Sequence, residues 1–233
     1  MNTGKFKNKY FILLLLLLGP GIVLIFLSKA DHNFELLPIY GERDLEFKAG
    51  QDVPDTIYHT IPDFSFTNQE GQEVTYADFE DKIIVADFFF TTCPTICPIM
   101  TKQMTRLQWL LEDEVYRQVH FLSHTVNPKH DTPEVLKAYA LEQGADLERW
   151  TFLTGNQEII FEHGFESYLL NTQEDAGAPG GFLHSSMFVL VDKERRIRGF
   201  YDGTSTKEVD DLVTDIKMLM KEASMRESEK IRR

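Results

Sequence analysis

Two cysteines four positions apart are the residues of this sequence best suited to chemistry. Cys93 and Cys97 are the only cysteines among 233 residues, and a proline follows each of them. On a helix, this spacing puts both sulfurs on the same side of one turn, where they can share a ligand or oxidise to each other. A disulfide-stapled scaffold would use more cysteines, spread along the chain. The pair therefore indicates redox chemistry or a metal.

The cysteines lie between a predicted strand and a predicted helix. Residues 83–90 form an apolar run rich in β-branched and aromatic side chains, which predicts a central strand. Apolar residues then recur at helical spacing, at Met100, Met104, Leu107 and Leu111. A helix N-terminus favours a thiolate and lowers the pKa of a thiol, so we expect the pair to be activated. Thiolate is the form that attacks disulfides and binds soft metals.

Several kinds of dithiol site can be compared with this pattern. A dedicated dithiol oxidoreductase usually separates its cysteines by two residues, whereas three separate this pair. Zinc would normally need a second Cys or His pair at short spacing, and the sequence has none. A peroxidatic cysteine would have Thr three residues before it, where this chain has Phe90. Two buried structural cysteines remain the simplest alternative, while two thiolates also suit Cu(I), with a third ligand from elsewhere.

The third ligand would be a histidine or a methionine distant in sequence. The candidates are His59, His120, His124, His130, His163, His184, Met100 and Met104. We expect the two methionines to be core residues because of their helical spacing, and His59, His130 and His163 to be solvated. His184 follows a Gly-rich loop and opens a predicted strand, a place from which a scaffold can present a side chain to a neighbouring site.

The remaining pattern predicts one α/β domain with a mixed central sheet flanked by helices, an arrangement compatible with a thioredoxin-like fold. Strands and helices alternate in the middle of the chain, and antiparallel pairs stand at both ends. Predicted strands are 61–67, 73–75, 83–90, 119–126, 150–153, 188–191 and 197–201; predicted helices begin near Cys97, Asp131, Asn156 and Lys207. We place this domain at 56–224, after a linker at 29–55 and before a charged tail at 225–233.

The N-terminus predicts delivery out of the cytoplasm. Three lysines within residues 1–9 precede an uncharged run from Tyr10 to Leu27, just long enough to cross a bilayer. The basic flank should stay in the cytoplasm, which puts the domain on the extracytoplasmic side. We expect one transmembrane anchor at 10–28, and the alternative is a signal peptide cleaved after Ser28-Lys29-Ala30. The formal net charge of −13 argues against nucleic-acid binding.

Three separated motifs resemble the Sco/SenC family, the assembly factors for the dinuclear copper site of cytochrome c oxidase. They are the segment from Cys93 to Pro98, the segment Asp131-Thr132-Pro133-Glu134-Val135-Leu136-Lys137, and His184 before a hydrophobic strand. The resemblance covers roughly residues 60–220. It implies a membrane-anchored, thioredoxin-like domain in which Cys93, Cys97 and His184 bind Cu(I) or Cu(II).

The resemblance also implies partners and a function. The domain would deliver copper to subunit II of the oxidase, with another copper chaperone or a thiol reductant as a further partner. The alternative is a thiol-disulfide oxidoreductase that keeps the copper-site cysteines of the oxidase reduced. In that case Cys93 and Cys97 would act as a redox pair, and His184 would be dispensable.

Two acidic residues are candidates for supporting the site. Asp87 lies six residues before Cys93 on the predicted central strand, as does the buried acid that assists thiol deprotonation in thioredoxin. Asp131 belongs to the second motif. Many family members have Val-Asp-Pro where this chain has Val126-Asn127-Pro128, so a supporting carboxylate is missing at Asn127.

Overall fold

The computed structural model describes residues 14, 16, 18–20, 36–47, 53–174 and 182–231. The chain divides into two compact units, Met1–Glu35 and Leu36–Arg233. Most of the expected anchor at 10–28 lies outside the described residues, as does the basic segment 1–9. Among the residues that are described, no helix has the length and apolar character needed to span a membrane.

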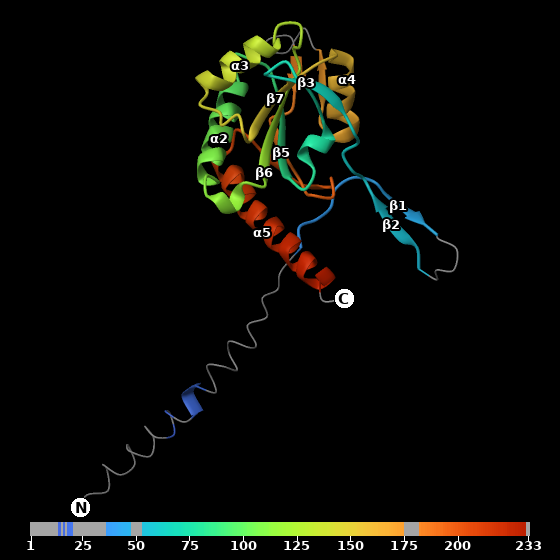
Figure 1. Cartoon of the computed structure of the whole chain (residues 1–233), viewed down its shortest axis with the longest axis vertical. Coiled ribbons are helices and arrows are strands. Elements are labelled where there is room, and N and C mark those ends of the chain that lie inside the picture. Colours follow the sequence, from blue (N-terminus) through green and yellow to red (C-terminus); the bar gives the residue numbers. More distant parts are fainter. Residues whose placement is uncertain are drawn as a thin grey trace, which may run out of the picture. The chain divides into compact units, whose positions relative to one another are not determined.

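The second unit is built on a seven-stranded mixed sheet in the order β11-β10-β5-β6-β7-β3-β4 (Figure 1). Its strands are β3 (Ser65–Asn68), β4 (Glu73–Thr75), β5 (Ile83–Phe89), β6 (Val119–Thr125), β7 (Trp150–Thr154), β10 (Met187–Val191) and β11 (Ile197–Asp202). Strands β5, β6 and β7 are parallel, and the other pairs are antiparallel. Two small antiparallel sheets join β1 (Arg43–Glu46) to β2 (Asp55–Tyr58) and β8 (Thr172–Glu174) to β9 (Phe182–His184).

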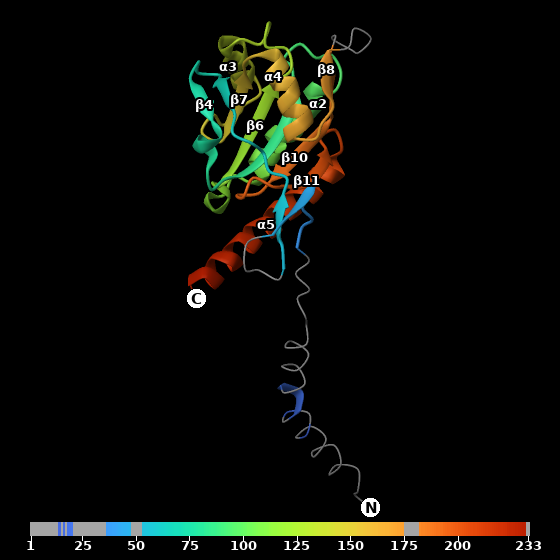
Figure 2. The same ribbon diagram turned by 90° about the vertical axis from the view of Figure 1, so that its right-hand side faces the viewer.

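Helices cover both faces of the large sheet. The α-helices are α2 (Cys97–Leu110), α3 (Pro133–Glu142), α4 (Gln157–Glu162) and α5 (Thr206–Ile231), with short helices η1 (Tyr76–Phe79), η2 (Glu114–Tyr116) and η3 (His163–Ser167). Helices α2 and α3 connect parallel strands by right-handed crossovers and so share one face. Two side chains of α2 donate hydrogen bonds to neighbouring helices. Thr105 Oγ1 donates to Gln143 O at the end of α3, and Gln103 Nε2 donates to Thr206 Oγ1 at the start of α5. Helix α4 lies on the other side of the sheet (Figures 1 and 2).

Strand β5 is the centre of the core and leads directly to the cysteines. All seven of its residues are buried, because sheet neighbours flank it and helices cover both of its faces. The predicted mixed α/β architecture is therefore confirmed. The predicted start of α3 is also correct: Thr132 caps the helix by accepting from Val135 N, and Pro133 occupies its first turn.

Three regions differ from the sequence-based expectation. Residues 43–46, assigned to a linker, form β1, and the compact unit begins at Leu36 rather than at 56. Every residue of β1 is exposed, so the strand carries no burial pattern by which it could be recognised. Helix α5 continues to Ile231 through most of the expected tail. The pair β8–β9 occupies parts of the region expected to be a Gly-rich loop.

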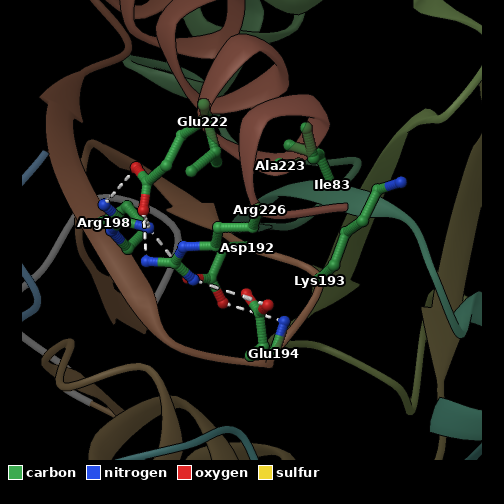
Figure 3. Close-up of a pocket in the computed structure, with 9 residues that line it drawn as sticks. Ile83, Asp192, Lys193, Glu194, Arg198, Glu222, Ala223 and Arg226 are labelled. Atoms are coloured by element: carbon green, nitrogen blue, oxygen red, sulfur yellow. Dashed lines mark hydrogen bonds and ion pairs between the residues drawn. The ribbon is translucent and has the colours of Figure 1, made fainter. Parts of the chain in front are cut away.

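A buried ion network holds the segment by which the chain enters this unit. The Arg198 guanidinium donates to Leu37 O at 2.7 Å and to Pro38 O at 3.0 Å. It also donates to Asp192 Oδ2 at 3.0 Å and to Glu222 Oε2 at 2.8 Å (Figure 3). Asp192 directly follows β10, whose last residue is opposite Ile84 near the start of β5. The chain therefore enters at the end of the sheet opposite the cysteines, which follow the other end of β5.

Candidate functional site

Cys93 and Cys97 lie at the point where β5 passes into α2, as predicted. Cys93 is in the turn after the strand and donates its backbone N–H to Phe90 O at 3.2 Å. Cys97 is the first residue of α2, with a proline in the first turn of the helix. Both side chains are buried, and both are thiols with no disulfide between them. Cys93 Sγ lies 3.7 Å from Thr95 Oγ1.

The expectation that the helix N-terminus activates Cys97 is wrong for the protein without metal. Burial raises the pKa of the Cys97 thiol well above its usual range, and the neighbouring Cys93 and Asp87 raise it further. A hydrogen bond with the backbone of Phe90 lowers this pKa, but by less. Burial thus outweighs the hydrogen bond that favours the thiolate. A soft metal ion must therefore displace a proton from Cys97 when it binds.

Asp87 is a buried acid on β5 beneath the cysteines. Its exposed fraction is 2%, so it is buried, as the comparison with the buried acid of thioredoxin predicts. Burial raises its pKa to about 7, while a hydrogen bond with the Ser123 side chain opposes the shift. Among the described residues, Asp87 Oδ1 has no hydrogen-bond partner. The acid is thus positioned to exchange a proton near neutral pH, close enough to Cys97 to influence its pKa.

Replacing Asp87 with Asn is expected to stabilise the domain at pH 8 by about 2 kcal/mol. The unfolded carboxyl ionises above pH 3.8 and the folded one above about 7, so stability falls with rising pH across that window. Three pKa units correspond to about 4 kcal/mol, and an unpartnered buried amide group would offset about 2 of these. Urea unfolding at pH 8 and pH 3.5 checks this. A variant that is less stable than the native protein at pH 8 would refute the prediction.

Asp131 is fully buried and holds the loop that precedes Cys93. Its carboxylate accepts from Thr91 N at 3.1 Å, Thr91 Oγ1 at 2.5 Å and His130 Nδ1 at 2.9 Å, and also from Thr125 Oγ1. It therefore ties the end of β5 to the end of β6, two residues before the first cysteine. The turn that carries it is held by Asn127 O, which accepts from the backbone N–H of His130 and of Asp131.

His184 lies at the same end of the sheet as the cysteines. It ends β9, where its backbone is paired with Thr172 of β8. Strand β10 begins three residues later and runs antiparallel to β5, so its start lies beside the end of β5. The side chain of His184 is outside the described part of the structure. The topology thus brings all three predicted ligands to one end of the sheet.

The structure also describes the burial and contacts of five other candidate ligands. Met100 and Met104 are fully buried core residues, as expected. The expectation that His163 is solvated is wrong, since its exposed fraction is 6% and it packs against His124, Phe64 and Phe66. Helix α4 continues into the π-helical turn η3 at His163, which turns the ring inward. His59 is half-buried, with Nε2 2.8 Å from Ser167 O, and His130 is exposed.

The structure adds supporting residues that the sequence pattern did not identify. Thr91 and Thr125 are bonded to Asp131, and Tyr139 of α3 donates to or accepts from Thr101 of α2 at 2.7 Å. Burial raises the pKa of Tyr139 to about 12, with further increases from Cys97, Asp87 and Cys93, so this phenol also lies close to the dithiol. Thr91 and Tyr139 lie 40 and 38 residues from their partners, so no local pattern could have indicated these two contacts, whereas Thr125 lies six residues before Asp131.

Two thiols at the start of a helix fit a soft metal ion such as Cu(I). Among the side chains that the structure describes, no three His, Cys, Asp or Glu residues converge as a metal site. A third ligand from the neighbouring β9 is therefore consistent with the arrangement. Asp87 and the Asp131–Thr91 contact then support the pair from below and from the preceding loop.

Comparisons with known proteins match most of the chain to the family that the sequence motifs resemble. A family model described as SCO1/SenC matches residues 54–221. A SCO1 protein homolog of Bacillus subtilis is 34% identical over 170 residues, which cover 72% of this chain and 87% of that protein. The solved structure of BsSco, described as a member of the Sco family of cytochrome c oxidase assembly proteins, is 33% identical with a TM-score of 0.62, covering 70% of this chain and 94% of that one. A Stutzerimonas stutzeri protein described as copper-binding is 33% identical over 100 residues, 43% of this chain and 48% of that protein.

Proposed function

Because the chain belongs to the SCO1/SenC family, we propose that it binds copper through Cys93, Cys97 and His184 and takes part in the assembly of cytochrome c oxidase. The observation that carries this proposal is the convergence of the two thiols and the backbone of His184 at one end of the sheet. The donor set suits Cu(I), because thiolate and imidazole are ligands that copper prefers. Assembly of the oxidase and copper binding are both described for the relatives above.

Copper would be passed to subunit II of the oxidase by stepwise exchange of ligands. Binding of Cu(I) replaces the thiol protons, and transfer to cysteines of the partner returns protons to Cys93 and Cys97. The raised pKa of Cys97 favours this release, because its thiol is protonated at neutral pH once copper has left. The site can thus hold copper without retaining it irreversibly.

Transfer can be tested directly with the copper domain of subunit II. Protein loaded with Cu(I) is mixed with the metal-free partner domain, a one-electron oxidant such as ferricyanide is then added to bring the two transferred ions to the mixed-valence state, and the absorption of the dinuclear copper site is followed. We expect the absorption to develop with the native protein and to be absent with Cys97→Ser. His184→Ala is expected to bind copper more weakly and transfer less of it. Equal transfer by all three proteins would contradict the proposal.

A second function is favoured by the buried acid beside the dithiol. Asp87 can accept a proton from a cysteine of the pair, as needed for thiol-disulfide exchange. Cys93 and Cys97 would give two electrons and two protons to a disulfide of the partner and become a disulfide themselves. In this reaction His184→Ala would be fully active. The reduction potential of the pair discriminates, since a strongly oxidising pair could not act as a reductant.

We further propose that residues 10–28 anchor the protein in the cytoplasmic membrane, with the domain on the extracytoplasmic, periplasmic side. The support is the basic flank before an uncharged run of sufficient length. Carbonate extraction of membranes and mass determination of the mature chain test this. A shorter, soluble chain beginning near residue 31 would indicate a cleaved signal peptide instead.

A further inference from the structure

The β1–β2 ribbon is a small sheet separate from the main one. Its four paired positions run from Arg43↔Tyr58 to Glu46↔Asp55. A two-stranded ribbon is only marginally stable by itself in water. At its base it is held to the domain by Ile61 N, which donates to Arg195 O at 2.8 Å, and by Arg196, which lies over the Tyr58 ring. Beyond this base, β1 is exposed along its whole length.

The two faces of the ribbon differ in chemistry. Residues that are paired across the strands, or two apart along one strand, point to the same side. One side therefore carries Arg43, Leu45, Thr56 and Tyr58, and continues to Phe47 beyond the end of β1; we call it the apolar face after Leu45 and Phe47. The other side carries Asp44, Glu46, Asp55 and Ile57, and by the same alternation continues to Val53 before β2; we call it the acidic face after its three carboxylates. Leu45 is 62% exposed and Phe47 is 72% exposed.

The position of the ribbon in the chain limits what can cover the apolar face. The uncharged run ends at Leu27, and eight residues, 28–35, connect it to Leu36. Eight extended residues reach at most about 29 Å. Leu36 begins the unit, and the segment that follows is fixed by Arg198 at the end of the sheet opposite the cysteines. If residues 10–28 are anchored, Leu36 is therefore held within about 29 Å of that segment, and the ribbon follows seven residues later in the chain.

We propose that the apolar face of the β1–β2 ribbon rests on the lipid bilayer, with Leu45 and Phe47 inserted at the boundary between headgroups and acyl chains. The proposal depends on the proposed anchor. Arg43 lies on the same side, where its guanidinium suits the lipid headgroups, while Tyr58 at the base of the ribbon packs against Arg43 and Arg196. The acidic face turns to water, away from lipid phosphates. Since the anchor holds the ribbon at high local concentration, even a weak contact is populated.

This contact would give the domain a defined orientation. Strand β5 runs from the end where the chain enters to the end that carries the cysteines. With the ribbon and the entry of the chain on the bilayer, Cys93, Cys97 and β9 would lie at the far end of β5, a strand about 20 Å long. The metal site would then be presented to a partner domain above the membrane rather than to lipid.

Quenching of introduced tryptophans by brominated lipid tests the contact. The full-length chain is reconstituted in phosphatidylcholine vesicles with or without bromine on the acyl chains. The variants are Phe47→Trp and Leu45→Trp on the apolar face, Ile57→Trp on the acidic face, and Ile159→Trp near the cysteine end of the sheet. The emission of the native protein, which has two tryptophans, is subtracted from each. Ile57 and Ile159 are matched controls, with exposed fractions of 49% and 53%.

We expect bromine to remove most of the added emission of Phe47→Trp and Leu45→Trp and to leave Ile159→Trp unchanged, with Ile57→Trp less affected than its neighbours. Equal quenching of all four variants, or of none, would overturn the contact. A blue shift of Phe47→Trp that follows the protein-to-lipid ratio rather than bromine would assign the face to a second copy and also overturn it. If the native chain does not sediment with the vesicles, the anchor fails too. Copper titration of the same samples reports on the proposed function separately.

Discussion

Replacing Asp131 with Ala is expected to lower the free energy of unfolding by about 3–5 kcal/mol. The change removes the acceptor of three donors, which are the buried hydroxyl of Thr125 and the half-buried N–H and hydroxyl of Thr91. Each unsatisfied buried donor destabilises by about 1–3 kcal/mol. Because Thr91 stands two residues before Cys93, the affinity for Cu(I) should fall in the same variant. Urea unfolding and competitive copper titration measure the two effects.

Two further variants show whether the effect belongs to this carboxylate. Asp131→Asn keeps one acceptor oxygen and should be intermediate in both measurements. Asp78→Ala removes a carboxylate that also accepts from a threonine, Thr75 N at 2.7 Å, but that is exposed. It should destabilise by about 1 kcal/mol and leave copper binding unchanged. If Asp131→Ala resembled Asp78→Ala in both respects, Asp131 would not position the site.

Acidification from pH 6.5 to pH 4 is expected to remove about 3 kcal/mol of stability through His163 alone. Burial lowers the pKa of His163 to about 4, below the 6.5 of the unfolded chain. The unfolded state therefore binds the proton first, and stability is lost across this window and levels off below it. Burial also lowers the pKa of His124, and the neighbouring His163 lowers it further, so His124 acts in the same direction. Burial lowers the pKa of His120 to about 4 as well.

His163→Phe isolates this contribution. The substitution keeps a ring among Phe64, Phe66 and Tyr168, whose centroids lie 5.1–5.3 Å from the imidazole. At pH 7.5 the variant and the native protein should have similar stability. At pH 4.5 the variant should be more stable by about 2–3 kcal/mol. Urea unfolding at both pH values measures these differences. If both proteins lost the same free energy of unfolding on acidification, His163 would not be the source of the pH dependence.

Helices and strands could be predicted from the sequence where they have a clear local pattern, such as an apolar run or a helix cap. The strand before Cys93 is an unbroken apolar run, and α3 has a capping Thr132 with Pro133 behind it, so both could be predicted. Strand β1 could not, because its residues are exposed on both faces. His163 points inward where the helix becomes π-helical, and the spacing of apolar residues in the sequence does not predict such a turn.

The sequence predicted which residues form the candidate site, but it did not predict the pKa of their side chains. Residue types and spacing identified the dithiol, and resemblance selected His184. The protonated state of Cys97 could not be foreseen, because a local helix argument omits the burial that α2, α3 and β5 impose together. Asp131 was recognised as a candidate, whereas its partners Thr91 and Thr125 became apparent only in the fold.

X-ray absorption at the copper edge tests the central claim most directly. For the protein loaded with one equivalent of Cu(I), we predict scattering from two sulfur neighbours near 2.3 Å and one nitrogen neighbour near 2.0 Å, roughly the metal–thiolate and metal–imidazole lengths known for zinc. In His184→Ala the nitrogen should be lost and both sulfurs retained. In Cys97→Ser one sulfur should be lost. A copper ion without sulfur neighbours, or a nitrogen signal unchanged in His184→Ala, would contradict the assignment of Cys93, Cys97 and His184 as its ligands.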